Sequence, residues 1–322
     1  MDKKLISVVT PCYNEEENVE NLYMQIKLIF DKMNSYSYEH IFIDNASKDK
    51  TVLILKEIAK RDKNVKIIVN TRNFGHIRSP YYAFFQASGD AVICIFADLQ
   101  DSPSIINNFV TKWEEGFKIV VGVKRKSKEN FIIFAIRKLY YILLNKYAET
   151  EQIKNFSGYG LYDRQFVDTL RTISDPYPYF RGLITEIGFD IAKVPYDQPK
   201  RKKGISKNSF YTLYDTAMLG FVNHSKVPLR LATFTGFAVS IFSFLSALVY
   251  FIYKLIFWDR FDVGIAPLVI GLFFFAAVQL FFVGMIGEYI GAIYTQVKNR
   301  PLVVVKERIN FETEELAETL VE

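Results

Sequence analysis

The chain has 322 residues, of which 50% are hydrophobic and 23% are charged, and its formal net charge is +5. The hydrophobic share excludes an intrinsically disordered protein, and 16 glycines with 10 prolines are too few for a fibrous one. Two cysteines exclude a disulfide scaffold and a cysteine-based zinc module, and three scattered histidines argue against a histidine-ligated metal.

Strands and helices are predicted to alternate over the first 125 residues. Helical spacing runs through residues 15–33 and again through 52–59, where Ser47 or Asp49 is the predicted N-cap. Short apolar runs predict buried strands over residues 5–10, 40–43, 65–69, 91–97 and 119–123. This alternation predicts an α/β fold, with an open, mostly parallel sheet covered by helices on both faces.

The carboxyl ends of these strands are the expected ligand site, because open α/β sheets bind their ligands there. Four polar loops follow the strands, over residues 11–17, 44–49, 71–75 and 98–101. The sequence contains neither a Gly-x-Gly-x-x-Gly nor a Walker A motif. The fold is therefore suited to a nucleotide, though not by the dinucleotide or NTPase pattern.

The last of these loops carries hard oxygen donors. Asp98 and Asp101, with the amide oxygen of Gln100, suit Mg²⁺ or Mn²⁺ shared with substrate phosphates, where the ion would neutralise a departing diphosphate. The alternative is a solvated turn or a helix cap, since a helix opens directly after the loop. In the other loops, Asp44 either takes ribose hydroxyls or closes an Asx turn, and Arg72 either contacts a diphosphate or is solvated.

Two long uncharged runs lie near the end of the chain, over residues 231–253 and 264–287. Each is long enough for a membrane span, which needs about 20 apolar residues, and the alternative is two buried helices of a soluble core. Trp258, in the turn between the runs, suits a membrane interface. Basic residues precede and follow the pair, so we expect a multi-pass protein of the cell (inner) membrane with the α/β domain and both termini cytoplasmic.

Each of the four loops contains a recognisable motif. In chain order these are Val-Thr-Pro-Cys-Tyr-Asn-Glu-Glu (9–16), Ile-Asp-Asn-Ala-Ser-Lys-Asp (43–49), Arg-Asn-Phe-Gly (72–75) and Ala-Asp-Leu-Gln-Asp (97–101). Together they resemble the family 2 glycosyltransferases, and most closely the polyprenyl-phosphate branch that includes dolichol-phosphate mannose synthase and bactoprenol glucosyltransferase. The later Pro228-Leu229-Arg230, the two uncharged runs and the stretch 287–291 fit the same branch.

The resemblance implies a GT-A fold, a C-terminal two-helix transmembrane hairpin and a nucleotide-diphosphate sugar as donor, with uridine as the expected base. The side chains that would hold the nucleoside are Pro11, Tyr13, Glu15, Asp44 and Ser47. Arg72 would lie near the donor. Asp98, as a catalytic residue, would bind Mg²⁺ or Mn²⁺ and the diphosphate together with Gln100.

Two positions depart from the family pattern. Phe96 stands where the family often has the first Asp of Asp-x-Asp, so one metal ligand is missing. Gly158-Tyr159-Gly160-Leu161 stands in place of Asp-Phe-Arg-Leu, so an acid often proposed as a base and a nearby Arg are absent. A phosphate monoester tolerates this loss, because its second pKa is about 6 and it arrives largely ionised. It needs positive charge to hold it in line with the donor.

Two basic segments supply positive charge: residues 118–128 carry five basic residues, and residues 193–207 carry six against one Asp. The predicted ligands of the acceptor phosphate are Arg125, Arg201, Ser206 and Lys207. Arg201, the second catalytic residue, and Ser206 come from the family motif Arg-x-x-Gly-x-Ser, whereas the other two are added from charge alone. The alternative is attraction of the lysines to anionic lipid headgroups.

The predicted domains are a cytoplasmic GT-A domain over 1–228 that includes membrane-interface helices at 131–147 and 210–222, two transmembrane helices within 229–290, and a cytoplasmic tail over 291–322. The alternative for the stretches 131–147 and 210–222 is packing against the sheet. The tail includes a strand-like run at 302–305 and is interpreted as solvated or in contact with another subunit.

These features predict a membrane-bound inverting glycosyltransferase (a hexosyltransferase). It would move a sugar from a nucleotide donor to polyprenyl phosphate, with undecaprenyl phosphate as the expected acceptor, for cell-envelope glycan modification. A glycan or lipid hydroxyl acceptor stays open as an alternative, as does a non-enzymatic scaffold for a sugar-flipping partner. A processive polysaccharide synthase is disfavoured, because two spans are few and no Gln-x-x-Arg-Trp motif is present. We expect a homo-oligomer, a sugar-lipid flippase as a further partner, and no nucleic acid.

Overall fold

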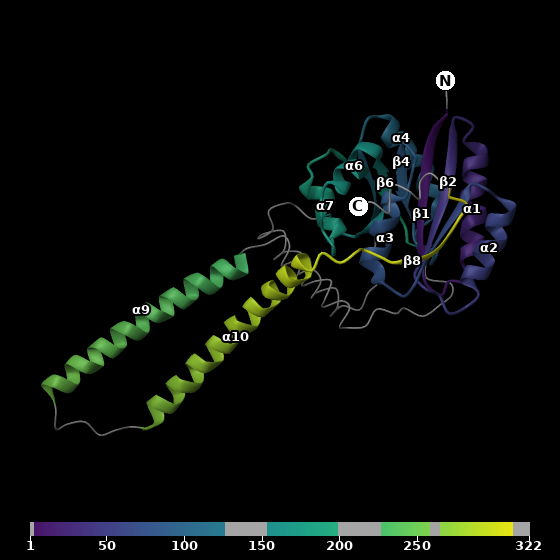
Figure 1. Ribbon diagram of the computed structural model, residues 1–322. Coiled ribbons are helices and arrows are strands. Elements are labelled where there is room, and N and C mark those ends of the chain that lie inside the picture. Colours follow the sequence, from purple (N-terminus) through teal and green to yellow (C-terminus); the bar gives the residue numbers. More distant parts are fainter. Residues whose placement is uncertain (1–2, 126–152, 199–226, 258–264, 312–322) are drawn as a thin grey trace.

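The computed structural model describes residues 3–125, 153–198, 227–257 and 265–311 (Figure 1). Within these residues, one eight-stranded sheet consists of β1 (Lys4–Cys12), β2 (Tyr36–Asp44), β3 (Val65–Asn70), β4 (Ala91–Cys94), β5 (Ile119–Lys124), β6 (Phe156–Asp163), β7 (Ile191–Tyr196) and β8 (Val305–Ile309). The described helices are α1 (Val19–Lys32), α2 (Thr51–Arg61), α3 (Gly75–Phe85), η1 (Pro103–Ile105), α4 (Ile106–Glu114), α6 (Arg164–Arg171), α7 (Phe180–Glu186), α9 (Val227–Ile256) and α10 (Ile265–Val297).

The strand order is β7-β5-β6-β4-β1-β2-β3-β8. Strands β4, β1, β2 and β3 run parallel, β5 and β7 run parallel to each other, and β6 is antiparallel to both β4 and β5. The prediction of an open, mostly parallel sheet is therefore confirmed. One edge of the sheet gathers the carboxyl ends of β1–β5 and β7 with the amino end of β6, and we call it the carboxyl edge.

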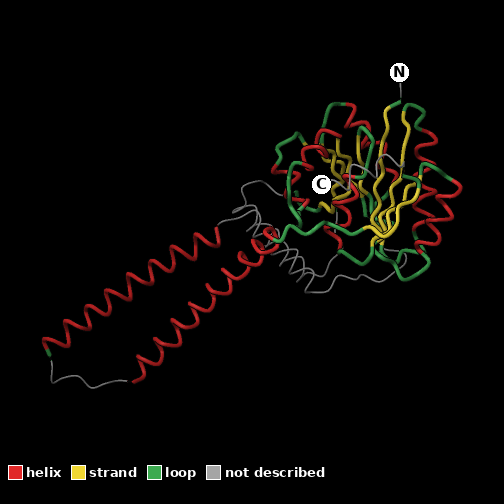
Figure 2. Tube along the Cα trace, viewed as in Figure 1, coloured by secondary structure: helices red, strands yellow, loops and turns green. Residues whose placement is uncertain are grey.

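The buried apolar side chains form two layers, one on each face of the sheet. The helices that flank the strands are drawn in red in Figure 2. Strand residues alternate between the layers, as Phe42 in one and Ile41 with Ile43 in the other show. Helices α1, α2 and α4 pack on the first face, and α3, α6 and α7 pack on the second. This burial on both faces explains why the strands are continuous apolar runs in the sequence.

Several predicted boundaries differ from the structure. The first helix begins at Val19 rather than residue 15, and β4 ends at Cys94 rather than residue 97, because the loops of the carboxyl edge take the remaining residues. Helix α2 has Lys50 as its N-cap instead of Ser47 or Asp49, although the Asp49 carboxylate accepts the Thr51 N–H at 3.0 Å. Helix α3 was not predicted.

Helices α9 and α10 contact each other and extend away from the sheet (Figure 1). Most of their described side chains are exposed and apolar. Among the described residues, 271–297 is the one segment long and apolar enough to cross a membrane, and the apolar part of α9, residues 232–246, is shorter. The predicted interface helices at 131–147 and 210–222, and Trp258, lie outside the described residues.

The chain returns to the sheet after α10 (Figure 1). Strand β8 pairs antiparallel with β3, and the Lys56 ammonium lies 2.7 Å from a carboxylate oxygen of Glu307. The Asn310 amide donates to the carbonyls of Ala59 and Val65, both at 2.8 Å. The interpretation of this part of the chain as a solvated tail is therefore wrong for Val305–Ile309, which form an edge strand. This strand begins at the last residue of the run predicted at 302–305.

Candidate active site

Backbone strain concentrates at the carboxyl edge. Of the six non-glycine residues with positive φ in the described part of the chain, four lie in its loops: Asn14, Ala46, Leu99 and Asn155, with φ between 54° and 62°. Left-handed backbone costs free energy for such residues and recurs where a binding or catalytic geometry must be held. The strained residues thus lie at the edge where open α/β sheets bind their ligands, the carboxyl ends of the parallel strands.

The loops after β1 and β2 are joined through Ser47. Its hydroxyl accepts the Asn14 N–H at 2.8 Å and donates to the Asp44 carboxylate, whose second oxygen accepts the Ser47 N–H at 2.8 Å. The Asn14 side-chain oxygen in turn accepts the Lys48 N–H at 2.7 Å. These bonds hold two predicted nucleoside-binding loops in one fixed arrangement.

Asp44 lies beneath this arrangement, with 0% of its surface exposed. Burial raises the pKa of its carboxyl group, against the lowering effect of the Ser47 hydrogen bonds. Both carboxylate oxygens accept from Ser47, as in an Asx turn. In this structure Asp44 shapes the loop, whereas Pro11, Tyr13, Glu15 and Ser47 are partly exposed at the same edge.

The loop after β3 is fixed by Asn45, which sequence reasoning did not assign to the site. The Asn45 side-chain oxygen accepts the Phe74 N–H at 2.9 Å, and its amide donates to the Gly75 carbonyl at 3.0 Å. The Arg72 guanidinium is exposed and lies 4.0 Å from the centre of the Phe74 ring. Arg72 therefore lies at the carboxyl edge, on a loop held by hydrogen bonds, where its guanidinium can bind an anionic ligand.

The loop after β4 carries the predicted metal ligands. Asp98 is partly exposed, and its Oδ1 accepts the Gln100 N–H at 3.1 Å. The Gln100 side-chain oxygen accepts from the Gln198 amide at 3.1 Å, just beyond β7. Two oxygen ligands on side chains two residues apart suit a divalent ion that completes its shell with phosphate oxygens and water. Among the described residues, no group of three or more Asp, Glu, His or Cys side chains forms a metal cluster.

Asp101 has a different position from Asp98. It is 3% exposed and accepts a hydrogen bond from the Tyr196 hydroxyl. Burial raises the pKa of its carboxyl group. This carboxylate ties the loop to β7 rather than facing the solvent, so Asp98 and Gln100 are the oxygen donors that the loop presents.

Arg125 follows β5 at the same edge. Its N–H donates to the Tyr196 carbonyl at 3.0 Å, and its guanidinium lies 3.5 Å from the exposed carboxylate of Asp197. Two exposed partners at this distance interact weakly, so the guanidinium can be drawn to a phosphate. The other predicted acceptor ligands, Arg201, Ser206 and Lys207, lie outside the described residues.

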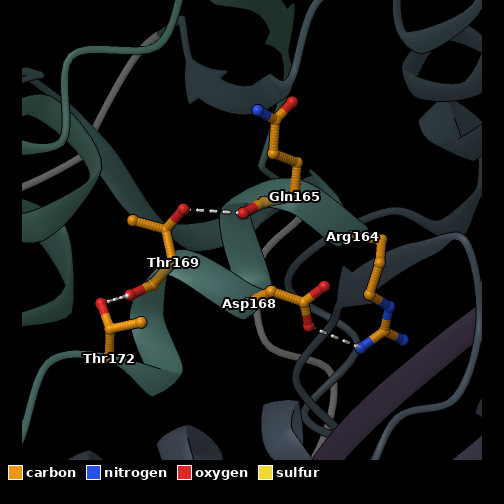
Figure 3. A pocket seen from close by; sticks show the side chains of 5 residues that line it. All are labelled: Arg164, Gln165, Asp168, Thr169 and Thr172. Carbon is orange, nitrogen blue, oxygen red and sulfur yellow. Dashed lines mark hydrogen bonds and ion pairs between the residues drawn. The ribbon is translucent and has the colours of Figure 1, made fainter.

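An open hollow on α6 lies apart from the loops of the carboxyl edge. Its lining is drawn in Figure 3 and consists of Arg164, Gln165, Asp168, Thr169 and Thr172. Arg164 donates to the carbonyls of Ala87 and Gly89 and so serves to hold the turn before β4. Helix α6 follows the carboxyl end of antiparallel β6, which lies at the opposite edge of the sheet.

Comparison with known sequences gives strong matches over most of the chain. Residues 7–171 match the profile of the family described as Glycosyl transferase family 2. The chain is 33% identical over 311 residues to the "Uncharacterized glycosyltransferase YkcC" of Bacillus subtilis, with 96% of each chain covered. It is 32% identical over 302 residues to the "Bactoprenol glucosyl transferase" of Shigella phage SfII, covering 94% of this chain and 97% of that one.

Solved structures with a similar fold have lower identity. A glucosyl-3-phosphoglycerate synthase from Mycobacterium tuberculosis, in complex with Mn²⁺, UDP and phosphoglyceric acid, aligns with 19% identity and a TM-score of 0.49, covering 68% of this chain and 76% of that one. TarS residues 1–349 of S. aureus in complex with UDP align with 17% identity and a TM-score of 0.42, covering 68% and 66%.

Proposed function

Because the chain belongs to glycosyltransferase family 2, we propose that it transfers one sugar from a nucleotide-diphosphate donor to a polyprenyl phosphate. The α/β domain has the GT-A fold that the sequence motifs imply, and the protein is a glycosyltransferase. The observation that carries the proposal is the meeting of three groups at one sheet edge. These are the bridged loops around Ser47, the oxygen donors Asp98 and Gln100, and the cation Arg125.

The proposed donor is a UDP-sugar. Tyr13 and Glu15 are partly exposed beside the Asn14–Ser47 bridge, where a nucleoside would meet side chains on a rigid backbone. Arg72, on the neighbouring loop, would pair with the diphosphate. A braced site of this kind stabilises the donor without the free-energy cost of ordering its loops on binding.

Asp98 and Gln100 would hold Mg²⁺ or Mn²⁺ together with the diphosphate. The bound ion would supply charge neutralisation to the departing nucleoside diphosphate. The Gln198 amide orients Gln100, and the buried Asp101–Tyr196 bond fixes the loop that carries both donors. Because the chain contributes few oxygen donors, we expect the metal affinity to depend on the bound nucleotide.

The proposed acceptor is an anionic phosphate monoester on a polyprenyl chain, as the name of the bactoprenol glucosyl transferase relatives suggests. Its oxygen would attack the anomeric carbon from the face opposite the diphosphate, which inverts that carbon. Arg125 would offset the repulsion between acceptor phosphate and donor diphosphate. Arg201, Ser206 and Lys207 stay predicted ligands of the same phosphate.

Membrane attachment through α9 and α10 is the second part of the proposal. The Gln296 amide, near the end of α10, donates to Asp175 of the domain at 2.8 Å, and β8 joins the sheet soon after. A chain that leaves the domain into α9 and returns from α10 to the same domain must cross the membrane an even number of times. We therefore propose two crossings, with the domain at the cytoplasmic face beside the basic residues Lys298 and Arg300. A second subunit and a sugar-lipid flippase stay predictions from the sequence.

The test uses the purified full chain in detergent with Mg²⁺, a short polyprenyl phosphate and a panel of UDP-sugars, and measures the mass of the lipid product. The expected product is one sugar heavier and is cleaved by mild acid, as a glycosyl phosphate is. An acid-stable product would contradict the phosphate acceptor and favour a hydroxyl acceptor. Asp98→Asn should reduce turnover more than about 100-fold, while the matched variant Asp168→Asn, at the opposite edge, keeps it. Unchanged cellular glycosylation with Asp98→Asn would favour the scaffold alternative.

A further inference from the structure

Phe96 is an aromatic side chain next to the proposed metal site. Burial alternates along the chain after β4: Ile95 and Ala97 are buried, whereas Phe96 and Asp98 are partly exposed. Phe96 and Asp98 therefore share the less buried side of this segment. Phe96 belongs to neither apolar layer formed by the described residues, so the packing of the domain core does not account for it.

Gly158 lies opposite Phe96 on the neighbouring strand. The antiparallel register pairs Cys94, the last residue of β4, with Gly160, and the chain beyond Cys94 carries Phe96 to the side of Gly158, two residues back along β6. A Cβ atom added to Gly158 would lie 3.8 Å from Cζ of Phe96 and 3.9 Å from Cε2. The tip of the ring therefore lies over the Gly158 backbone. The two positions at which the sequence departs from the family pattern are thus neighbours in space.

The backbone of Gly158 explains why no side chain shares this space. Its φ of +105° is a conformation that side chains rarely adopt, and the Tyr162 hydroxyl donates to its carbonyl at 2.9 Å. The pair therefore forms an uncharged surface beside the carboxylate of Asp98. A carboxylate at either position would instead add negative charge where the donor diphosphate is proposed to bind.

From this geometry we propose that the Phe96 ring, which packs on the Gly158 backbone, contacts the sugar of the donor. The inference rests on the proposed function, in which Asp98 holds the diphosphate through a metal ion. The sugar is bonded to the second phosphate of that diphosphate, so it lies within a few atoms of Asp98. A sugar ring has an apolar face of C–H groups, and an aromatic ring offers a rigid apolar partner with little loss of conformational freedom.

The proposal distinguishes the sugar from the nucleotide. If the ring contacts the sugar, its removal weakens binding of a UDP-sugar and leaves binding of UDP nearly unchanged. If the ring only packs its own loop, its removal disturbs Asp98 and weakens both ligands equally. If the ring instead contacts the polyprenyl chain, donor binding is unchanged and the KM for the acceptor rises.

The experiment compares wild type, Phe96→Leu and Phe96→Tyr as purified full chains with Mg²⁺. Calorimetric titrations with UDP, UDP-glucose and UDP-N-acetylglucosamine give the dissociation constants, and thermal unfolding checks that each variant is folded. For the UDP-sugar that the wild type binds more tightly, we expect Phe96→Leu to weaken binding about five- to tenfold, and UDP binding less than about twofold. Phe96→Tyr, which keeps the ring, should stay within about twofold of wild type for both.

Equal weakening of UDP and the UDP-sugar, or no change in either, would overturn the inference, as would a change confined to the acceptor KM. The proposed function is judged separately by the wild type. A wild type that binds a UDP-sugar but does not transfer it to polyprenyl phosphate refutes the acceptor and leaves the binding comparison valid. A wild type that binds no UDP-sugar refutes the donor and the role of Phe96 together.

Discussion

The variant Ser47→Ala removes the hydroxyl that joins the loops after β1 and β2. It leaves the Asn14 N–H without its acceptor and removes one of the two Ser47 donors to Asp44. A neutral hydrogen bond contributes about 0.5–1.5 kcal/mol, and one to a charged group about 1.5–3 kcal/mol. Because water can reach the partly exposed Asn14, we take the lower half of the summed range, about 2–3 kcal/mol.

The loss of the bridge should appear both in the stability of the free protein and, separately, in nucleotide binding. A loss of about 2 kcal/mol lowers the unfolding temperature by roughly 4–8 °C in a domain of this size. Since the nucleotide must then order the loops itself, we expect its affinity to fall about tenfold, which corresponds to about 1.4 kcal/mol. Thermal unfolding and calorimetric titration with UDP measure the two effects.

Two further variants make this test specific. Ser37→Ala, at the other end of β2, removes an exposed hydroxyl that donates to the Lys4 carbonyl at 3.4 Å, and it should change neither quantity measurably. Ser47→Thr keeps the hydroxyl and should recover most of the affinity. Wild-type affinity for UDP in Ser47→Ala would show that the bridge does not hold the nucleotide-binding geometry, and would refute the reasoning.

Three further predictions concern the buried Glu39–Lys66 pair, the proposed metal ligand Asp98, and the contacts of Asn310 and Glu307 beside β8. Glu39→Ala should lower the free energy of unfolding by about 3–5 kcal/mol, because it removes a buried carboxylate that lies 2.8 Å from the largely buried Lys66 ammonium and accepts hydrogen bonds from Ser7 and Ser88. Combining it with Lys66→Met should recover part of the loss in thermal unfolding. Burial acts to raise the pKa of Glu39, but hydrogen bonds from Lys66 and two serines outweigh it and lower that pKa. The stability from this pair is therefore complete above the unfolded pKa of about 4.3 and is lost as pH falls through the lower folded value, so a Glu39→Gln variant should show a shallower fall of unfolding temperature on acidification. Asp98→Asn should reduce turnover more than about 100-fold, with any residual rate requiring at least tenfold more Mg²⁺ in a metal titration; wild-type turnover after complete chelation would exclude the metal. Asn310→Ala should cost about 1–2 kcal/mol in thermal unfolding, since two main-chain carbonyls lose their donor, whereas Glu307→Gln at a half-exposed ion pair should cost less than about 1 kcal/mol; the reverse order would contradict the burial argument.

The sheet could be predicted because its strands are apolar on both faces and short. Residues 65–69 and 119–123 were assigned within one residue of β3 and β5 for this reason. Strand β8 was assigned too early and treated as part of a tail, because its partner β3 lies more than 230 residues earlier and no local pattern reports such a pairing. Helix α3 was missed because Pro80 and clustered aromatic residues obscure its spacing.

The site could be predicted as a set of loops, but not side chain by side chain. The carboxyl edge could be predicted as the ligand site, because the carboxyl ends of parallel strands lie together and open α/β sheets bind their ligands there. Whether a carboxylate faces the ligand or the interior depends on the turn that carries it. Asp98 and Asp101 are three residues apart, yet the first is partly exposed and the second is bonded to Tyr196 from a strand almost 100 residues later. Asp44 and Asn45 are likewise distinguished only by their three-dimensional partners.

Strand β8 also constrains how the protein is made. The ribosome completes β3 long before β8, and at ordinary rates of synthesis the interval is roughly 10–50 s. During that time the outer edge of β3 exposes unpaired main-chain groups, which are prone to pair with other chains. The nascent domain can cover this edge only after α9 and α10 have emerged, so its maturation waits for the two apolar helices to leave the translation machinery. Premature termination after α10 would leave the domain with an open, aggregation-prone flank.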